Sequence, residues 1–183
     1  MDVTICICTY GDVTWSHRAL TTAWPSAQGQ ARTLVVHDDT LHGARNTAAR
    51  LAQSEWLIYL DADDRLGPGY VTAMAQADGD LRAPALGEDY GQLVPLDLTD
   101  RDIEQMNPCC IGTAIRRDMV LDIGWQPWPA WEDWALFLTA HRRGAVIEHV
   151  PDALYIAGVR PGSRNRNIAN PAQLHADIRK AAR

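Results

Sequence analysis

An apolar run near the middle of the chain ends in three acidic residues within four positions, in the stretch WLIYLDADDRL from Trp56 to Leu66. Carboxylates that crowd together where a buried strand emerges repel one another, which raises one or more of their pKa values unless a cation lies among them. Such hard oxygen ligands suit Mg²⁺ or Mn²⁺, and Mg²⁺ is usually held by one or two carboxylates together with substrate phosphates. The pattern therefore favours a site for a metal and a diphosphate.

A structural alternative is that Asp63 or Asp64 caps the helix expected after RLGPG. An aspartate at that position accepts hydrogen bonds from the first free amides of a helix or forms an Asx turn. One aspartate is enough for a cap, so this interpretation leaves the other acidic residues unexplained.

The composition indicates one globular domain without a membrane segment. The 183 residues are 46% hydrophobic and carry a net charge of −6, which argues against bulk attraction to nucleic acid. No run approaches about 18 apolar residues, and MDVTICICTY has neither a basic start nor a cleavage site. We expect a cytoplasmic protein with a domain over residues 1–170 and a basic helix or tail over 171–183.

The four cysteines lie in apolar, strand-like segments, which is typical of reduced and buried thiols. A zinc site is the alternative, but C-x-C and C-C spacings match zinc-binding motifs poorly. The cysteines are Cys6, Cys8, Cys109 and Cys110.

Strands alternate with helices in the first half of the chain. The runs VTICICTY (3–10), RTLVVHDD (32–39) and EWLIYLDADD (55–64) predict strands, with helices over 14–23, where Pro25 would end the helix, and over 43–54. This order predicts an α/β fold with a mostly parallel sheet between helices. Ligands of such sheets bind outside the carboxyl ends of the strands, and here all three ends carry polar residues.

The second half is less regular. Helices are predicted over 67–78, 118–124, 131–144 and 170–183, and strands within 81–95, 107–117 and 145–151.

Five segments, in this order, resemble successive motifs of the family 2 glycosyltransferases, which are inverting enzymes of the GT-A fold. The resemblance covers most of the chain and implies one GT-A-like, Rossmann-related domain. The segments are TICICTYGD, VVHDDT, GARNTAARLAQSEWLIYLDADDRLGPGYV, GTAIRRDMVLDIGW and WEDWALFLTAHRRGAVIEHVPDALY.

The resemblance implies a site for a nucleotide-diphospho sugar at the strand ends. Thr9 and Tyr10 would contact the nucleobase, with Tyr10 stacking on it, and Asp39 would hydrogen-bond the edge of the base. Asp61 would reach the ribose or the metal, and Asp63 would bind the Mn²⁺ or Mg²⁺ ion that bridges the diphosphate. The alternative for Tyr10 is an aromatic side chain that only covers the rim of the sheet.

Three arginines are implied at the same site. Arg45 would lie near the base or the phosphates, although a salt bridge from the start of its helix to nearby acids is an alternative. Arg160 and Arg164, in VRPGSRNR, would clasp the diphosphate and balance its charge. The alternative for this segment is a solvated basic loop.

In the segment WEDW the resemblance implies Asp133 as the general base and Glu132 as its neighbour or an acceptor contact. The alternative is that acids in a first helical turn are favoured by the helix dipole. Trp128 and Trp131 would form an apolar platform for the acceptor, and simple burial in the core is the alternative.

The chain departs from the family pattern in two places. Only TLHG separates the DD and ARN segments, so a helix and a strand are missing there and we expect a smaller sheet. Arg160 stands where a histidine is common in the family. The chain is close to a minimal donor-binding core, and a homodimer is one way to complete its acceptor site.

The sequence thus predicts an inverting, metal-assisted glycosyltransferase that uses a nucleotide-diphospho sugar, with UDP favoured by family habit. A glycan, a lipid-linked sugar, a protein or a modified DNA base would each serve as acceptor. One alternative is a non-catalytic module that binds sugar nucleotides. Another is a phosphatase of the haloacid-dehalogenase type, although Asp64 follows Asp63 where that family has Thr or Val.

Overall fold

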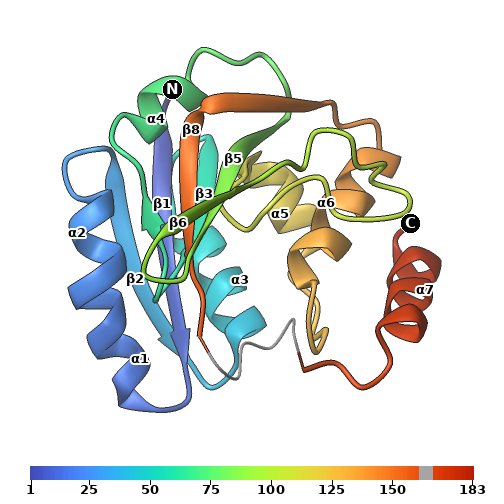
Figure 1. Cartoon of the computed structure of the whole chain (residues 1–183), viewed down its shortest axis with the longest axis horizontal. Coiled ribbons are helices and arrows are strands. Elements are labelled where there is room, and N and C mark those ends of the chain that lie inside the picture. Colours follow the sequence, from blue (N-terminus) through green and yellow to red (C-terminus); the bar gives the residue numbers. More distant parts are fainter. Residues whose placement is uncertain (161–166) are drawn as a thin grey trace.

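A sheet of eight strands forms the centre of the described part of the chain in the computed structural model, which covers residues 1–160 and 167–183 (Figure 1). The strand order is β2-β1-β3-β7-β5-β8-β4, and β6 pairs with β5. The strands are β1 (Val3–Tyr10), β2 (Arg32–Asp38), β3 (Trp56–Asp61), β4 (Arg65–Leu66), β5 (Leu81–Asp89), β6 (Leu93–Leu96), β7 (Ala114–Arg116) and β8 (Ile147–Gly158).

The sheet is mixed. β1 is parallel to β2 and β3, and β5 is parallel to β8. The pairs β3–β7, β5–β7, β5–β6 and β4–β8 are antiparallel. The predicted α/β class and the parallel first three strands are confirmed.

Helices cover both faces of the sheet, as Figure 1 shows. Alternate residues of β1 therefore enter two different apolar clusters. Ile5 and Ile7 pack with α4 and with the helical run over residues 13–27, which we call the first helical segment. Cys6 and Cys8 pack on the other face with α3, α5, α6 and α7. Burial on both faces explains why β1 is a continuous apolar run. The helices are α1 (Val13–Arg18), η1 (Ala19–Ala23), α2 (Trp24–Ala27), α3 (Leu41–Leu51), α4 (Tyr70–Met74), α5 (Arg117–Ile123), α6 (Glu132–Arg142) and α7 (Pro171–Ala181).

All four cysteines are buried free thiols, as predicted. Burial raises the pKa of each thiol, so they are protonated at neutral pH.

The expected end of the first helix at Pro25 is wrong. The chain continues as helix from Val13 to Ala27, with a π-helical segment, η1, immediately before α2. Pro25 lies in the first turn of α2, directly after η1, so its missing amide removes one hydrogen-bond donor from the continuous helix without ending it. The π-helical segment absorbs the local change in hydrogen bonding.

The expected strand over 107–117 is also mostly wrong. Only Ala114–Arg116 form β7, and residues 107–113 form a loop that packs against the start of α6. Gly112 is needed in this loop because a Cβ atom there would overlap the rings of Tyr155 and Tyr70.

The connection from β2 to α3 is as short as the sequence suggests. Thr40 caps α3 by accepting a hydrogen bond from the amide of Gly43, and β2 is an edge strand of the described sheet. The last strand is longer than predicted, because β8 continues beyond Pro151 through a register irregularity opposite Pro84 and Ala85 of β5.

Candidate active site

The carboxyl ends of β3 and β8 and the first turn of α6 surround a cleft of about 230 Å³, which we call the carboxylate cleft. Five of the residues that the sequence analysis assigned to the site line it together: Arg45, Asp61, Asp63, Glu132 and Asp133. The full lining is Arg45, Asp61, Asp63, Asp64, Leu86, Glu88, Cys110, Ile111, Glu132, Asp133, Tyr155, Ala157, Gly158 and Val159.

Arg45 joins the end of β3 to the start of α6. Its guanidinium group donates to Asp61 Oδ1 and to Glu132 Oε1, both at 2.8 Å, and only 1% of the residue is exposed. The same group lies 4.5 Å from the ring centre of Trp125. Burial alone lowers the pKa of Arg45, but Asp61 and Glu132 outweigh it and raise the pKa. The salt-bridge alternative for Arg45 is therefore realised, and its contact with a base or phosphate stays a prediction.

Asp63 forms an ion pair with Arg160. The Arg160 guanidinium also lies 5.0 Å from the ring centre of Trp15, at the start of the first helical segment. A basic residue thus faces the carboxylate that the sequence assigned to a metal. Arg164 lies outside the described residues.

Asp64 has a structural role that the capping alternative did not foresee. The residue that caps α4 is Gly69, and Asp64 instead accepts hydrogen bonds from the Tyr155 hydroxyl at 2.7 Å and the Gly158 amide at 2.8 Å. The Tyr155 oxygen also accepts from the amide of Asp61. Burial, and then the charge of Asp61, raise the pKa of Asp64 to about 7. These contacts fix the turn after β3 against β8.

Asp133 faces the cleft from the first turn of α6. Its Oδ2 accepts a hydrogen bond from the side-chain amide of Asn107 at 3.1 Å, and its Oδ1 accepts from the Trp134 amide at 2.9 Å. Burial, and then the charge of Glu132, raise the pKa of Asp133 to about 6. The side chain is therefore mostly ionised at neutral pH and still has an appreciable proton affinity.

A second hollow, the Tyr10 pocket, has a volume of about 290 Å³ and adjoins the carboxylate cleft through Glu132, which lines both. Tyr10 and Asp39 line it as the sequence suggested, but Thr9 does not. Thr9 is buried, and its hydroxyl lies 3.0 Å from His37 Nδ1. The remaining lining residues are Thr40, Leu41, His42, Gln126, Pro127 and Trp128.

The two tryptophans assigned to an acceptor platform are placed differently. Trp128 lines the Tyr10 pocket. Trp131 caps α6 with φ of 53° and packs edge-on against His175 of α7, at 4.3 Å between ring centres. A left-handed backbone at a bulky residue stores strain and is found most often at functional sites. Trp131 immediately precedes Glu132 and Asp133, so this geometry sets the direction of the first turn of α6.

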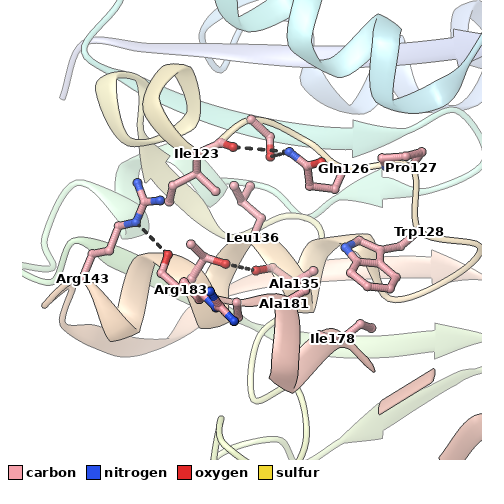
Figure 2. Close-up of a pocket in the computed structure, with 13 residues that line it drawn as sticks. Ile123, Gln126, Pro127, Trp128, Ala135, Leu136, Arg143, Ile178, Ala181 and Arg183 are labelled. Carbon is pink, nitrogen blue, oxygen red and sulfur yellow. Dashed lines mark hydrogen bonds between the residues drawn. The ribbon is translucent and has the colours of Figure 1, made fainter. Parts of the chain in front are cut away.

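A larger pocket of about 500 Å³ lies between the α5–α6 connection, α6 and α7, and Figure 2 shows it. Its walls are mainly apolar, with Leu136 and Ile178 facing Pro127 and Trp128, and Arg143 stands at one end. Arg143 donates to the carbonyl of Arg183 at 3.1 Å. No carboxylate side chain lines this pocket. The carboxylates that the sequence analysis assigned to chemistry line the carboxylate cleft instead.

Within residues 1–160 and 167–183, no three His, Cys, Asp or Glu side chains are grouped to hold a metal ion by themselves. A metal in the carboxylate cleft would need oxygen ligands from a bound molecule. The same part of the chain contains no helix that is long and apolar enough to cross a membrane.

Sequence reasoning missed Asn107 and Tyr155, which hold Asp133 and Asp64. The pair Asn107-Pro108 does predict a turn. The contact of Asn107 with Asp133 is tertiary, however, and the local sequence does not predict it.

Comparison with known proteins supports the resemblance. Residues 19–83, from η1 into β5, match the model of the family described as Glycosyl transferase family 2. This confirms the resemblance to the family 2 glycosyltransferases. No curated protein matches the sequence.

Solved structures of TarS from S. aureus share the fold. The structure of TarS 1-349 in complex with UDP-GlcNAc has a TM-score of 0.66 at 15% identity, covering 97% of this chain and 64% of that one. Another structure of TarS 1-349 has a TM-score of 0.65 at 16% identity, covering 86% and 60%. The chain thus spans about 60% of the length of that structure. At this identity the likeness shows the fold, and the expected GT-A-like domain is confirmed.

Proposed function

We propose that this chain transfers a sugar from a nucleotide-diphospho sugar to an acceptor hydroxyl, with inversion at the anomeric carbon. The observation that carries the proposal is the meeting of Asp61, Asp63 and Asp133 in one cleft beside the Tyr10 pocket. The family match and the TarS complexes with UDP-GlcNAc and UDP support it. The same matches argue against the phosphatase alternative.

The nucleoside would bind in the Tyr10 pocket. The Tyr10 ring would stack on the base, while the exposed Asp39 carboxylate would accept hydrogen bonds from its edge. Because Glu132 lines both hollows, a ligand bound in the Tyr10 pocket would extend directly into the carboxylate cleft. The diphosphate and the sugar would occupy that cleft.

A divalent metal fits the donor set when a diphosphate is present. Asp63 offers a hard carboxylate oxygen, and Mg²⁺ or Mn²⁺ is commonly held by one or two carboxylates and phosphate oxygens. When bound, the ion would neutralise charge on the leaving diphosphate. Arg160, which pairs with Asp63, would contact the same phosphates once that carboxylate binds the metal.

Asp133 would act as the general base. Its carboxylate removes the proton of the acceptor hydroxyl while that oxygen forms a bond to the anomeric carbon. The bond from this carbon to the diphosphate breaks on the opposite face, the nucleoside diphosphate leaves with the electron pair, and the configuration inverts. A pKa of about 6 matches this task, because the base is ionised at neutral pH and still binds protons.

Calorimetry and thermal shift with UDP-, GDP-, dTDP- and CDP-sugars, with and without Mn²⁺ or Mg²⁺, test the donor site. We expect one nucleotide to bind in the presence of metal, and Asp63→Ala to weaken this binding at least about tenfold by removing the metal ligand. Asp89→Ala, which also breaks an ion pair with an arginine (Arg65) but does not line the carboxylate cleft, is the matched control. Absence of binding by every nucleotide with either metal would overturn the proposal.

A further inference from the structure

We propose that Asn107 is a positioning residue that aims the Asp133 carboxylate into the carboxylate cleft through a neutral hydrogen bond from the loop between β6 and β7. The inference rests on the proposed role of Asp133 as the base. It assigns a function to a side chain outside the motifs that carried the family resemblance.

The orientation of the Asn107 amide is fixed by its neighbours. Its Oδ1 accepts a hydrogen bond from the backbone amide of Cys109 at 3.0 Å, so its NH₂ group must face Asp133 Oδ2, 3.1 Å away. A flipped amide would place NH₂ against a donor and oxygen against a carboxylate. The following Pro108 restricts the backbone of Asn107, and the carbonyl of Asn107 accepts from Arg101 at 3.2 Å.

The same loop holds α6 at a second point. The Trp134 indole donates to the carbonyl of Ile103 at 2.8 Å, and the Trp134 amide donates to Asp133 Oδ1. The two carboxylate oxygens of Asp133 therefore each accept one fixed hydrogen bond, one from the loop and one from the helix. This sets the plane of the carboxylate and leaves a lone pair on each oxygen for a proton.

A neutral donor suits a base better than a cation does. The adjacent Glu132 is held by the guanidinium of Arg45, and a cation at Asn107 would likewise favour the charged form of Asp133 and weaken its proton affinity. An amide orients the carboxylate with much less of this penalty.

Three charged side chains change the pKa of Asp133 besides its burial. Glu132 of α6 and Asp61 of β3 raise its pKa, and Arg45 of α3 lowers it. The protonated thiols of Cys109 and Cys110, in the same loop as Asn107, also face it. The charge pattern around Asp133 is thus set by three elements, and Asn107 contributes direction without charge.

Two variants separate position from charge. Asn107→Asp keeps an oxygen for the Cys109 amide but replaces the donor with a second carboxylate, whereas Asn107→Leu removes both hydrogen bonds at similar volume. Asp102→Leu is the matched control, because Asp102 accepts from the Glu104 amide in the same loop and has no contact with Asp133. The pKa of Asp133 is measured from its ¹³C carboxyl shift, and turnover is measured as UDP released from UDP-GlcNAc with Mn²⁺.

We expect Asn107→Asp to raise the pKa of Asp133 and to lower kcat at neutral pH by about tenfold or more, with partial recovery as the pH rises. Asn107→Leu should lower kcat by about tenfold and leave KM for UDP-GlcNAc within about twofold. The reason is that the Asp133 carboxylate loses its fixed orientation while donor binding is kept. Asp102→Leu should change neither the pKa nor kcat.

An unchanged Asp133 pKa in Asn107→Asp, or full kcat in both Asn107 variants, would overturn the inference. Failure of the proposed function looks different. If the wild-type protein releases no nucleoside diphosphate from any nucleotide sugar of the binding screen, or if Asp133→Asn keeps full turnover, the proposed function fails, while the ¹³C titration still decides whether Asn107 faces Asp133.

Discussion

The carboxylate cleft holds Asp61 and Asp63 in one way and Asp133 in another. At the end of β3, Asp61 and Asp63 are each paired with a guanidinium group, from Arg45 and Arg160. At the start of α6, Asp133 is held by the neutral amide of Asn107 and has a pKa raised to about 6. The ion pairs fix the direction of Asp61 and Asp63, whereas Asp133, with its raised pKa and a neutral partner, can exchange a proton near neutral pH.

The strongest way to break this contrast is Arg45→Met. The change removes the guanidinium group that pairs with Asp61 and Glu132 in a largely buried place, so we expect a loss of about 3–5 kcal/mol in the free energy of unfolding. Urea denaturation followed by tryptophan fluorescence measures it.

Arg50→Met is the matched control, since Arg50 is exposed on the same helix and only donates to Thr47. A control change within about 0.5 kcal/mol is expected. If Arg45→Met were as mild as this control, the buried guanidinium would not be what holds β3 and α6 together.

A smaller effect concerns Asp133, whose ionisation should make the stability of the protein depend on pH. Burial raises the pKa of Asp133 to about 6 in the folded protein, from 3.8 for an unperturbed aspartate. Because the folded value is raised, ionisation of Asp133 costs stability, and this cost grows as the pH rises from 3.8 and is complete above about 6. Asp133→Asn removes this cost, and its Tm relative to wild type should rise by roughly 2–4 °C between about pH 5 and about pH 8.

Differential scanning calorimetry across this pH range makes the test, with the exposed Asp118→Asn as a control for the loss of one charge. A Tm difference that stays flat with pH would show that Asp133 is not strained by its surroundings, and the neutral-partner explanation would fail.

The site residues that could be predicted from the sequence are those at the ends of β1, β2 and β3. Each of these strands is a local apolar run that stops at polar residues, so the sequence shows both the strand and the side chains at its rim. The short connection from β2 to α3 could also be predicted, because only TLHG separates the DD and ARN segments. Tyr10, Asp39, Asp61 and Asp63 accordingly line the two hollows where expected.

The contacts that the sequence could not predict are tertiary. Arg45 reaches Glu132 across 87 positions, and Asn107 reaches Asp133 across 26. The 107–113 segment is apolar enough to be predicted as a strand, but in the structure it is a loop in which the ring of Tyr155 and the hydroxyl of Tyr70 lie close to Gly112. Local propensity contains no information about such partners.

The most direct test compares Asp133→Asn with wild type, using the nucleotide sugar that the binding screen selects. We expect binding within about threefold of wild type by calorimetry and turnover lower by about 100-fold or more, because only proton removal is lost. Wild-type turnover should fall as the pH drops through about 6, where Asp133 becomes protonated. Turnover by Asp133→Asn within twofold of wild type would contradict the assignment of the base and favour a module that only binds sugar nucleotides.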